Sequence, residues 1–375
     1  MRNLVCSNHI DDDAIKEYVK SNSHIGKCDY CSDNRDRKVV SLYDLGEFME
    51  RAIRLHYGEA GNELGFNSAE GGYLGSTFDT YELLFDEIGL GVENSELQDD
   101  LSSSLPDTVW CYANPYGATE SEQLGYDWEY FKNVVKHKAR YSFFYIEEMK
   151  HEGFGSYSYN ISDILSDIAK LITKYKLIRK LPVDTIFYRC RQHANRGEII
   201  DAKDIAAPPD DNVVFSNRMS PAGISMFYAG FDVDTAVIET VDITIISKPY
   251  YSVGQFTSLN EIMVVDFTKL PVRPSIFNIV KQDDYHPITF LRNLVTDLSQ
   301  SVKKDGREHI EYVPTQIITE YIRYILSPPH KNKVGGIIYP SAKKFKKNAC
   351  VLFLNHTESM KELNFNTFII SDKSI

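Results

Sequence analysis

Hydrophobic residues in the first half of the chain recur at the spacing of amphipathic helices. The clearest stripe runs from residue 160 to residue 174 and contains Ile161, Ile164, Leu165, Ile168, Leu171 and Ile172. A second stripe follows Ser41, which is placed to cap a helix, and it contains Leu42, Leu45, Phe48, Met49, Ala52, Ile53 and His56. Helical patterns also occur at 81–88 and from 127 to about 150, whereas 57–76 predict a loop and 93–120 show little periodicity. The first half is therefore predicted to be mainly helical.

The pattern changes near Lys180, just before Pro182, to short apolar runs rich in β-branched and aromatic residues. These runs are TIFYRC, SMFYAG, EIMVVDF, GGIIYP and ACVLFL. Helical segments lie between them, notably PTQIITEYIRYIL, where Pro314 suits a first helical turn. The fold class is therefore predicted to be α+β. Three parts are expected: a short Cys/His-containing segment (1–38), a mainly helical domain (39–180) and an α+β domain (181–375).

Composition and charge narrow the classes of protein that fit this pattern. Of the 375 residues, 43% are hydrophobic and 25% are charged, which permits a packed core and excludes global disorder. The formal charge of −12 argues against a general nucleic-acid binder, so a nucleic-acid partner is not expected. No apolar run reaches the roughly 18 residues of a membrane span. The first residues, MRNLVCSNHIDDD, lack the pattern of a signal peptide, so the predicted location is cytoplasmic, without membrane association.

Two chelating pairs near the N-terminus predict a zinc site. Cys6 and His9 form a C-x2-H pair, and Cys28 and Cys31 form a C-x2-C pair 18 residues later. Two ligands at this spacing can reach one ion from a single turn, and four complete a tetrahedral site. His24 is a rival fourth ligand but has no partner at the same spacing. Because no catalytic base lies nearby in the sequence, the Zn²⁺ is predicted to be structural.

Charged and aromatic residues in the second half suggest a site for a phosphate-bearing ligand. Arg189 lies at the end of a predicted strand, and Arg191 follows two residues later on the same face. The chain contains neither a phosphate-binding loop nor a complete glycine fingerprint. Any phosphates must therefore be held by side chains, and the planar guanidinium of Arg189 or Arg218 matches their oxygens. Tyr228 on a strand, Glu239 on the helix capped by Asp232, and Ser341 after a strand complete the set of candidates.

These residues carry a resemblance to a known family. FYR at 187–189, NRMSPAGISMFYAGFDVDTAVIE at 217–239, Gln316, and GGIIYPS at 335–341 resemble the RES domain, named after an Arg, a Glu and a Ser that match Arg189, Glu239 and Ser341. The Cys/His pairs and WEYFKNVVKHKARY at 128–141 resemble the HEPN/RES N-terminal region. The resemblance implies a fold similar to mono-ADP-ribosyltransferase toxins and a toxin that destroys NAD⁺ by cleaving its nicotinamide–ribose bond. It places five residues in the NAD⁺ site: Arg189, Arg218, Tyr228, Glu239 and Ser341.

The implied reaction agrees with the residue types. Loss of nicotinamide leaves an oxocarbenium-like ribose, which a carboxylate such as Glu239 would stabilise. Water or phosphate could accept the ADP-ribosyl group. One alternative is a mono-ADP-ribosyltransferase that modifies a macromolecule. A second is a HEPN-type ribonuclease using Arg51 and His56, whose R-x4-H spacing fits that motif. An antitoxin or regulatory protein is a possible partner, the N-terminal half is expected to dock a partner or regulate the enzyme, and a homo-oligomer is possible.

Overall fold

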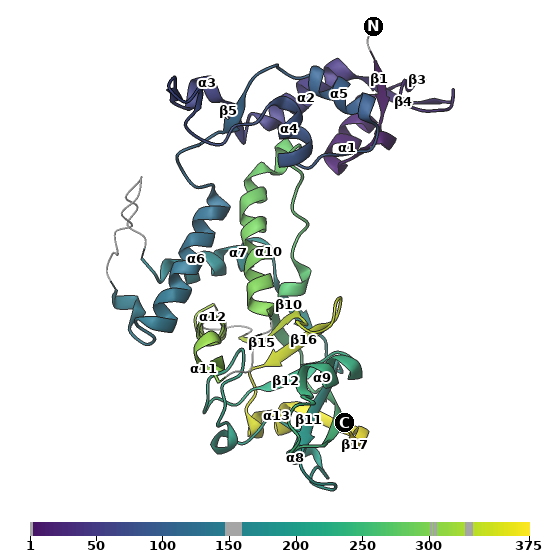
Figure 1. Ribbon diagram of the computed structural model, residues 1–375. Coiled ribbons are helices and arrows are strands. Elements are labelled where there is room, and N and C mark those ends of the chain that lie inside the picture. Colours follow the sequence, from purple (N-terminus) through teal and green to yellow (C-terminus); the bar gives the residue numbers. More distant parts are fainter. Residues whose placement is uncertain (1–2, 147–159, 301, 303–305, 327–332) are drawn as a thin grey trace. The chain divides into compact units, whose positions relative to one another are not determined.

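The computed structural model describes residues 3–146, 160–300, 302, 306–326 and 333–375 (Figure 1). The described residues fall into two compact units that do not follow chain order. The first contains the residues up to Gln123 together with Val272–Thr289. The second contains the described residues from Leu124 to Pro271 together with Phe290–Ile375. The expected segment boundaries at residues 38 and 180 stay predictions.

The first unit contains small antiparallel sheets and short helices. Its larger sheet has the strand order β1-β4-β3, and two-stranded ladders pair β2 with β8, β5 with β9 and β6 with β7. The strands are β1 (Leu4–Cys6), β2 (Ile10–Asp11), β3 (His24–Lys27), β4 (Asp36–Ser41), β5 (Tyr57–Glu59), β6 (Phe66–Asn67), β7 (Gly72–Tyr73), β8 (Gly91–Val92) and β9 (Trp110–Tyr112). The helices are η1 (Ser7–His9), α1 (Asp13–Asn22), α2 (Leu42–Ile53), α3 (Ala60–Glu63), α4 (Thr80–Glu82), the π-helical η2 (Leu83–Glu87), α5 (Ser95–Ser103) and η6 (Ile279–Asp284).

Helix α2 confirms the apolar stripe that predicted it, except at its end. Ser41 caps the helix by accepting a hydrogen bond from the backbone N of Asp44. The predicted face is buried at Leu45, Met49 and other positions. His56 was expected on this face, but the helix ends at Ile53 and His56 is only half-buried in the turn beyond it. The helix stops there because the chain turns to pair β5 with β9.

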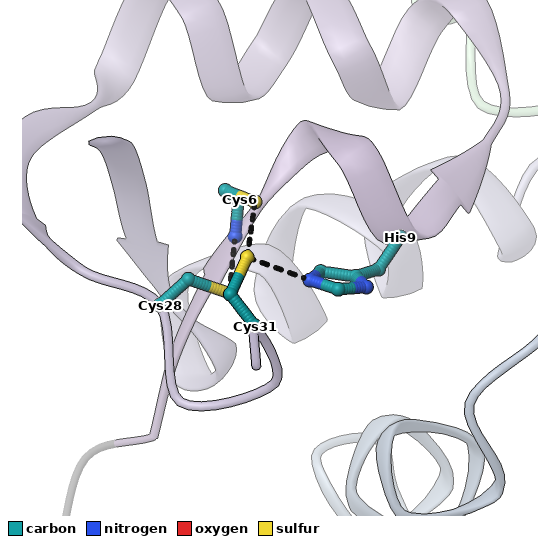
Figure 2. A group of neighbouring side chains, drawn as sticks. All are labelled: Cys6, His9, Cys28 and Cys31. Carbon is teal, nitrogen blue, oxygen red and sulfur yellow. Dashed lines mark hydrogen bonds between the residues drawn. The ribbon is translucent and has the colours of Figure 1, made fainter. Parts of the chain in front are cut away.

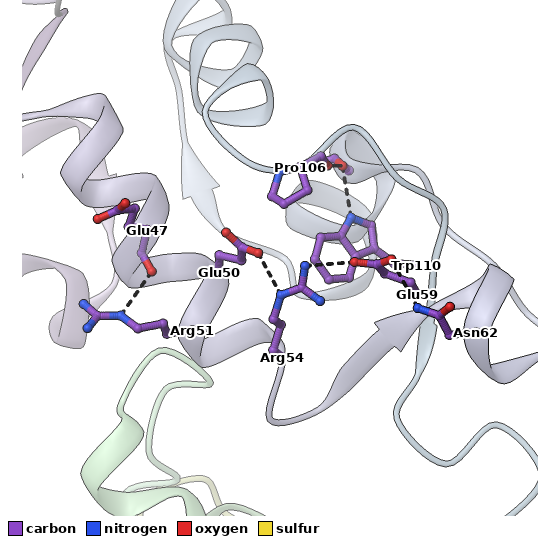
Figure 3. Close-up of polar contacts among 9 residues, drawn as sticks. Glu47, Glu50, Arg51, Arg54, Glu59, Asn62, Pro106 and Trp110 are labelled. Carbon is purple, nitrogen blue, oxygen red and sulfur yellow. Dashed lines mark hydrogen bonds and ion pairs between the residues drawn. The ribbon is translucent and has the colours of Figure 1, made fainter.

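Arg54 ties the end of α2 to the strand that follows it (Figure 3). Its Nε donates to Glu50 Oε1 at 2.7 Å, and its second terminal nitrogen donates to Glu59 Oε1 at 2.9 Å. The guanidinium also lies over the ring of Trp110, 5.4 Å from the centroid. Trp110 is fully buried and donates from Nε1 to Thr80 Oγ1 at 3.0 Å. The contacts of Arg54 therefore join α2 to β5 and to Trp110 of β9 within the first unit.

The second unit is built on an eight-stranded mixed sheet with the order β10-β14-β15-β16-β12-β11-β13-β17. Only β14 and β15 are parallel; the other neighbouring strands are antiparallel. All five apolar runs predicted as strands are confirmed, whereas three strands were not predicted. The strands are β10 (Ile178–Leu181), β11 (Ile186–His193), β12 (Phe227–Gly230), β13 (Tyr250–Ser258), β14 (Ile262–Asp266), β15 (Val334–Pro340), β16 (Asn348–Leu352) and β17 (Leu363–Ser374). Because β11 continues to His193, Arg189 lies inside the strand and not at its end.

The helices of the second unit bury their apolar sides against both faces of this sheet. The larger core contains Phe131, Ile168, Leu291 and Ile318 from four helices together with Val351 of β16. The helices are α6 (Glu120–His137), η3 (Phe143–Tyr145), α7 (Asp163–Lys174), α8 (Ala202–Ile205), η4 (Asp210–Asn212), α9 (Val233–Thr240), η5 (Phe267–Lys269), α10 (Tyr285–Ser299), α11 (Glu308–Glu311), α12 (Val313–Tyr324) and α13 (His356–Glu362). Two of them, α6 and α10, also have residues in the first unit.

Two helix predictions in this region are tested by the structure. The helix at 160–174 is confirmed as α7. The helix expected from 127 to about 150 is α6, which begins earlier, at Glu120, and ends at His137. Its end follows from the sequence, because Val135 is its last buried residue and polar side chains come next. The final residues of the predicted range lie outside the described residues. No helix among the described residues is long and apolar enough to cross a membrane.

We predict that Phe131→Ala lowers the free energy of unfolding of the second unit by about 3–5 kcal/mol, the range for a large aromatic ring removed from a core. Phe131 is fully buried on α6 and stacks on Trp128. Tyr126→Ala on the same helix is the matched control, because its side chain is 60% exposed. Urea unfolding followed by circular dichroism measures both. Equal effects of the two changes would contradict the packing described for α6.

Candidate functional site

Arg189 occupies the centre of the candidate site, on β11, an interior strand of the sheet. Its Nε donates to the backbone oxygens of Ile205 and Ala206 at 2.8 and 3.2 Å, and one terminal nitrogen donates to Tyr228 O at 2.7 Å. No carboxylate pairs with it among the residues that the structure describes. Burial, and secondarily the charge of Arg191, lower the pKa of Arg189 to about 10. The guanidinium therefore stays charged at neutral pH, with donors left for an anion.

Arg218 and Tyr228 come from the segment before β12 and from β12 itself. One terminal nitrogen of Arg218 donates to Leu298 O on α10 at 2.7 Å. The hydroxyl of Tyr228 accepts from Met219 N at 3.2 Å and shares a hydrogen bond of 2.9 Å with Ser220 Oγ. Burial raises the pKa of Tyr228 to about 12, so the hydroxyl is neutral at physiological pH. These bonds fix the Tyr228 ring at one orientation.

Glu239 lies near the C-terminal end of α9, the helix that Asp232 caps as predicted. The cap oxygen accepts from Thr235 N at 2.9 Å. Helix α9 can follow β12 this tightly because the strand ends in Gly230, where a Cβ would lie 2.9 Å from the backbone N of Ala236. The carboxylate of Glu239 accepts a 2.5 Å hydrogen bond from Ser341 Oγ. Two of the predicted residues, 102 positions apart, are thus in direct contact.

The turn at 341–347, called here the lysine turn, is attached to α9. Three of its lysines contact this helix while their side chains stay partly exposed to solvent. Lys343 Nζ donates to two carbonyl groups near the C-terminal end of α9, at 2.8 and 3.2 Å. A cation is favourable at this end of a helix. Two ion pairs of 3.1 Å add to the contact, Lys344 with Asp234 and Lys347 with Asp232.

These elements surround a cavity of about 350 Å³, called here the first cavity. Its walls contain four of the five predicted residues together with one lysine: Arg189, Arg218, Tyr228, Glu239 and Lys343. Ser341 is not in the wall and reaches the site through its bond to Glu239. The structure thus brings the five predicted residues together around one cavity. Two cations and a carboxylate on opposite elements can hold a ligand that carries both negative and developing positive charge.

Two residues that line this cavity, Lys343 and Tyr339, were not predicted from the sequence, and one residue considered there, Arg191, lies outside the cavity. Lys343 was not among the candidates from the sequence. Tyr339 lies two positions before Ser341, so the alternation of β15 was a signal that could have found it. Arg191 does not line the cavity; it is exposed, and its guanidinium donates to Asp204 O.

In the first unit, the four predicted metal ligands form a cluster (Figure 2). The end of β1 and the turn of η1 present Cys6 and His9, and the turn between β3 and β4 presents Cys28 and Cys31. Their ligand atoms all lie within 4.8 Å of one another. His24 is exposed on β3 and is not in the cluster, in agreement with its lower rank.

The distances in this cluster fit a tetrahedral zinc ion. Zinc–sulfur bonds of about 2.3 Å at tetrahedral angles place two sulfurs about 3.8 Å apart. The Sγ atoms of Cys6 and Cys31 are 3.7 Å apart, and His9 Nε2 is 3.2 Å from Cys31 Sγ. The backbone N of Cys6 donates to Cys28 Sγ at 3.3 Å, a bond common around metal thiolates. The cluster could hold one zinc ion, and four protein ligands leave no position for a substrate.

Comparison with known families identifies both halves of the chain. Residues 186–364 match the RES domain. The chain carries a RES domain. Residues 21–149 match HEPN/RES N-terminal domain 1, so this domain precedes the RES domain. No curated protein matches the chain.

The RES match spans Arg189, Arg218, Tyr228, Glu239 and Ser341. RES domains are generally toxin-like, NAD⁺-degrading enzymes with an ADP-ribosyltransferase fold. The predicted membership is therefore confirmed, and the family implies an enzyme whose substrate is NAD⁺. The individual roles of the five residues stay predictions. The N-terminal match includes Cys28 and Cys31 but begins after Cys6 and His9.

Arg51 and His56, the residues of the ribonuclease alternative, lie on different elements. Arg51 is on α2 and donates to Glu47 O at 3.3 Å (Figure 3). His56 lies in the turn after the helix, where its Nε2 contacts the side chain of Gln282. Its ring also lies 5.6 Å from that of His286. Because His56 is not on the helix that carries Arg51, the geometry does not favour this alternative.

We predict that protein purified without chelators contains about one zinc ion per chain, and that His9→Ala loses it. Since a short segment buries little apolar surface, the metal should contribute to its folding, and the variant should also unfold at a lower temperature. His24→Ala is the matched control and should retain zinc. Elemental analysis and thermal unfolding measure both. Absence of zinc from the wild type, or zinc in His9→Ala but not in His24→Ala, would refute the assignment.

Proposed function

We propose that the RES domain of this protein degrades NAD⁺ by cleaving the bond between nicotinamide and ribose. The observation that carries the proposal is the position of one carboxylate, that of Glu239, in the same cavity as two arginines that have no carboxylate partner among the described residues. NAD⁺ has the matching charges, since its pyrophosphate is anionic and its nicotinamide ring is cationic. The ADP-ribosyl cation that forms during cleavage adds positive charge on the ribose.

The arrangement explains how the bond breaks without a general acid. As the carbon–nitrogen bond breaks, its electron pair moves to the nicotinamide nitrogen, and the ring leaves as a neutral molecule. The leaving group therefore needs no proton, and the cost is concentrated in the oxocarbenium-like ribose. A fixed carboxylate beside that ribose stabilises its charge without reorganisation. Glu239 supplies this charge, and the hydrogen bond from Ser341 fixes the orientation of its carboxylate.

The remaining residues bind and orient the substrate. Arg218 and Arg189 hold phosphate oxygens through donors that their backbone contacts leave open. The ring of Tyr228, held by Met219 and Ser220, packs against the nicotinamide or its ribose. After nicotinamide leaves, water or phosphate attacks the same carbon, and attacking water loses a proton to solvent. The products are then ADP-ribose or its 1-phosphate.

Consumption of NAD⁺ would arrest growth of the cell that makes the enzyme. Such an enzyme needs restraint, so we expect an antitoxin or regulatory protein, and the N-terminal domain is a candidate for docking it. A homo-oligomer stays a prediction. Transfer of ADP-ribose to a macromolecule uses the same cavity and the same residues, so the acceptor alone separates this alternative from hydrolysis or phosphorolysis.

We predict that Glu239→Gln lowers kcat about a hundredfold or more while NAD⁺ still binds. The carboxylate acts only when positive charge appears on the ribose, so its loss affects the transition state more than the ground state. Asp234→Asn on the same helix is the control; it removes an exposed charge that pairs with Lys344, and it should change kcat by less than about threefold. Nicotinamide release measures kcat, and calorimetry measures binding. A Gln variant with wild-type turnover would show that Glu239 is not catalytic.

We predict that Arg218→Lys raises KM for NAD⁺ about tenfold, equivalent to about 1.4 kcal/mol, with a smaller effect on kcat. Lysine keeps the charge but loses the planar fork that binds two phosphate oxygens. Arg191→Lys is the matched control, since Arg191 lies outside the first cavity. Steady-state kinetics with NAD⁺ compare them. The assignment fails if Arg191→Lys raises KM and Arg218→Lys does not.

A further inference from the structure

A second cavity, of about 310 Å³, adjoins the first within the same unit. The two cavities share Arg218, Val302 and Tyr312 in their walls. One side of the second cavity comes from α6, which belongs to the region matched by HEPN/RES N-terminal domain 1. The N-terminal domain therefore supplies a wall to a space that continues from the proposed NAD⁺ site.

Three residues of α6 form this wall at helical spacing: Trp128, Lys132 and Lys136. Only 16% and 17% of the two lysine side chains are exposed. Lys132 Nζ and Trp128 Nε1 both donate to Asp297 Oδ2, at 2.8 and 2.7 Å. Lys136 Nζ donates to Glu311 Oε2 at 2.7 Å. The ammonium groups are thus held in place before any ligand arrives, which lowers the entropy cost of binding.

The charges around the cavity suit a ligand with phosphate and hydroxyl groups. Among the described residues, four cationic and two anionic side chains line it: Lys132, Lys136, Arg218, Arg307, Asp297 and Glu311. Positive charge therefore exceeds negative charge. The carboxylates can accept hydrogen bonds from ribose hydroxyls, as acidic residues do in other dinucleotide sites. Arg218 lies where the two cavities meet.

We propose that the second cavity receives the adenylate half of NAD⁺, with the pyrophosphate at Arg218 and the nicotinamide half in the first cavity. Each cavity alone is at the small end of the range for ligand sites, about 300–1,000 Å³, and two joined cavities match a ligand of two nucleotide halves. Lys136 and Lys132 then determine affinity for the adenylate half. The inference rests on the proposed function, since it assigns the rest of the same substrate.

Two measurements on the full chain test this assignment: calorimetric binding of ADP, which carries no nicotinamide, and the KM for NAD⁺. We expect Lys136→Met to weaken ADP binding and to raise KM about tenfold, with kcat changed less than about twofold. Lys136→Met removes the closer of two cationic partners of Glu311, the other being Arg307 at 3.6 Å. Lys136→Met combined with Glu311→Gln therefore separates loss of the cation from a carboxylate that has lost its closer partner. Lys136→Arg keeps the charge and should restore most of the affinity, with the fold checked by circular dichroism.

Lys170→Met is the matched control, because this lysine also pairs with a carboxylate, that of Asp167, but is 72% exposed and lines neither cavity. It should leave ADP binding and KM unchanged. The assignment is overturned if the wild type cleaves NAD⁺ but does not bind ADP, or if the single and double variants at Lys136 keep wild-type ADP affinity and KM. If ADP binds, the variants weaken it, and NAD⁺ is not cleaved, the adenylate site stands and the proposed reaction fails. Should Lys136→Met not fold, ADP binding to the wild type and to Lys136→Arg tests the assignment. If neither of these two proteins binds ADP, the assignment is overturned.

Discussion

A half-buried guanidinium, that of Arg189, without a carboxylate partner among the described residues is the constraint around which the second unit is arranged. Burying the charge of Arg189 is costly unless its donors are satisfied. The backbone oxygens of Ile205, Ala206 and Tyr228 satisfy part of them and draw α8 and β12 onto β11. Carbonyl groups offset the desolvation but carry no net charge. The site therefore keeps a positive charge that a phosphate can neutralise, and Tyr228, one of the residues that contact Arg189, also lines the first cavity.

The negative charge of the site, the carboxylate of Glu239, is positioned by a separate set of contacts. Glu239 is positioned by the short helix α9, and α9 is held at its C-terminal end by Lys343 and near its start by ion pairs from the same turn. The hydrogen bond from Ser341 then fixes the orientation of the carboxylate. The lysine turn therefore acts on Glu239 through α9, and the exposed ends of its side chains contribute little by themselves. Cation and carboxylate are held on separate elements, and no ion pair joins Glu239 to Arg189 or Arg218 in the structure.

The parts of this account that were predictable from the sequence are those with local signals. The cap at Asp232, the apolar stripes of α2 and α7 and the x2 spacing of the metal ligands each depend on neighbours a few residues apart. Helix α5 gave no such signal, because only Leu97 and Leu101 of its nine residues are buried. Strand β17 lies at the edge of the sheet with most of its side chains partly or fully exposed, so it lacks an apolar run.

Contacts between distant segments had no signal of this kind. Composition shows neither that Lys343 meets α9 nor that Lys136 meets Glu311, because these contacts depend on how the elements pack. The quoted motifs placed the five site residues in one family pattern, but their convergence on a single cavity is visible only in the folded chain.

The claim that a carboxylate and two arginines form a site for cleaving NAD⁺ is tested most directly by identifying the products. Purified protein is incubated with NAD⁺, with and without inorganic phosphate, and the mixture is analysed by mass spectrometry. The account predicts free nicotinamide in both cases, with ADP-ribose from water or the ADP-ribose 1-phosphate when phosphate is present. NAD⁺ that remains intact, or that breaks at the pyrophosphate and releases no nicotinamide, would contradict it.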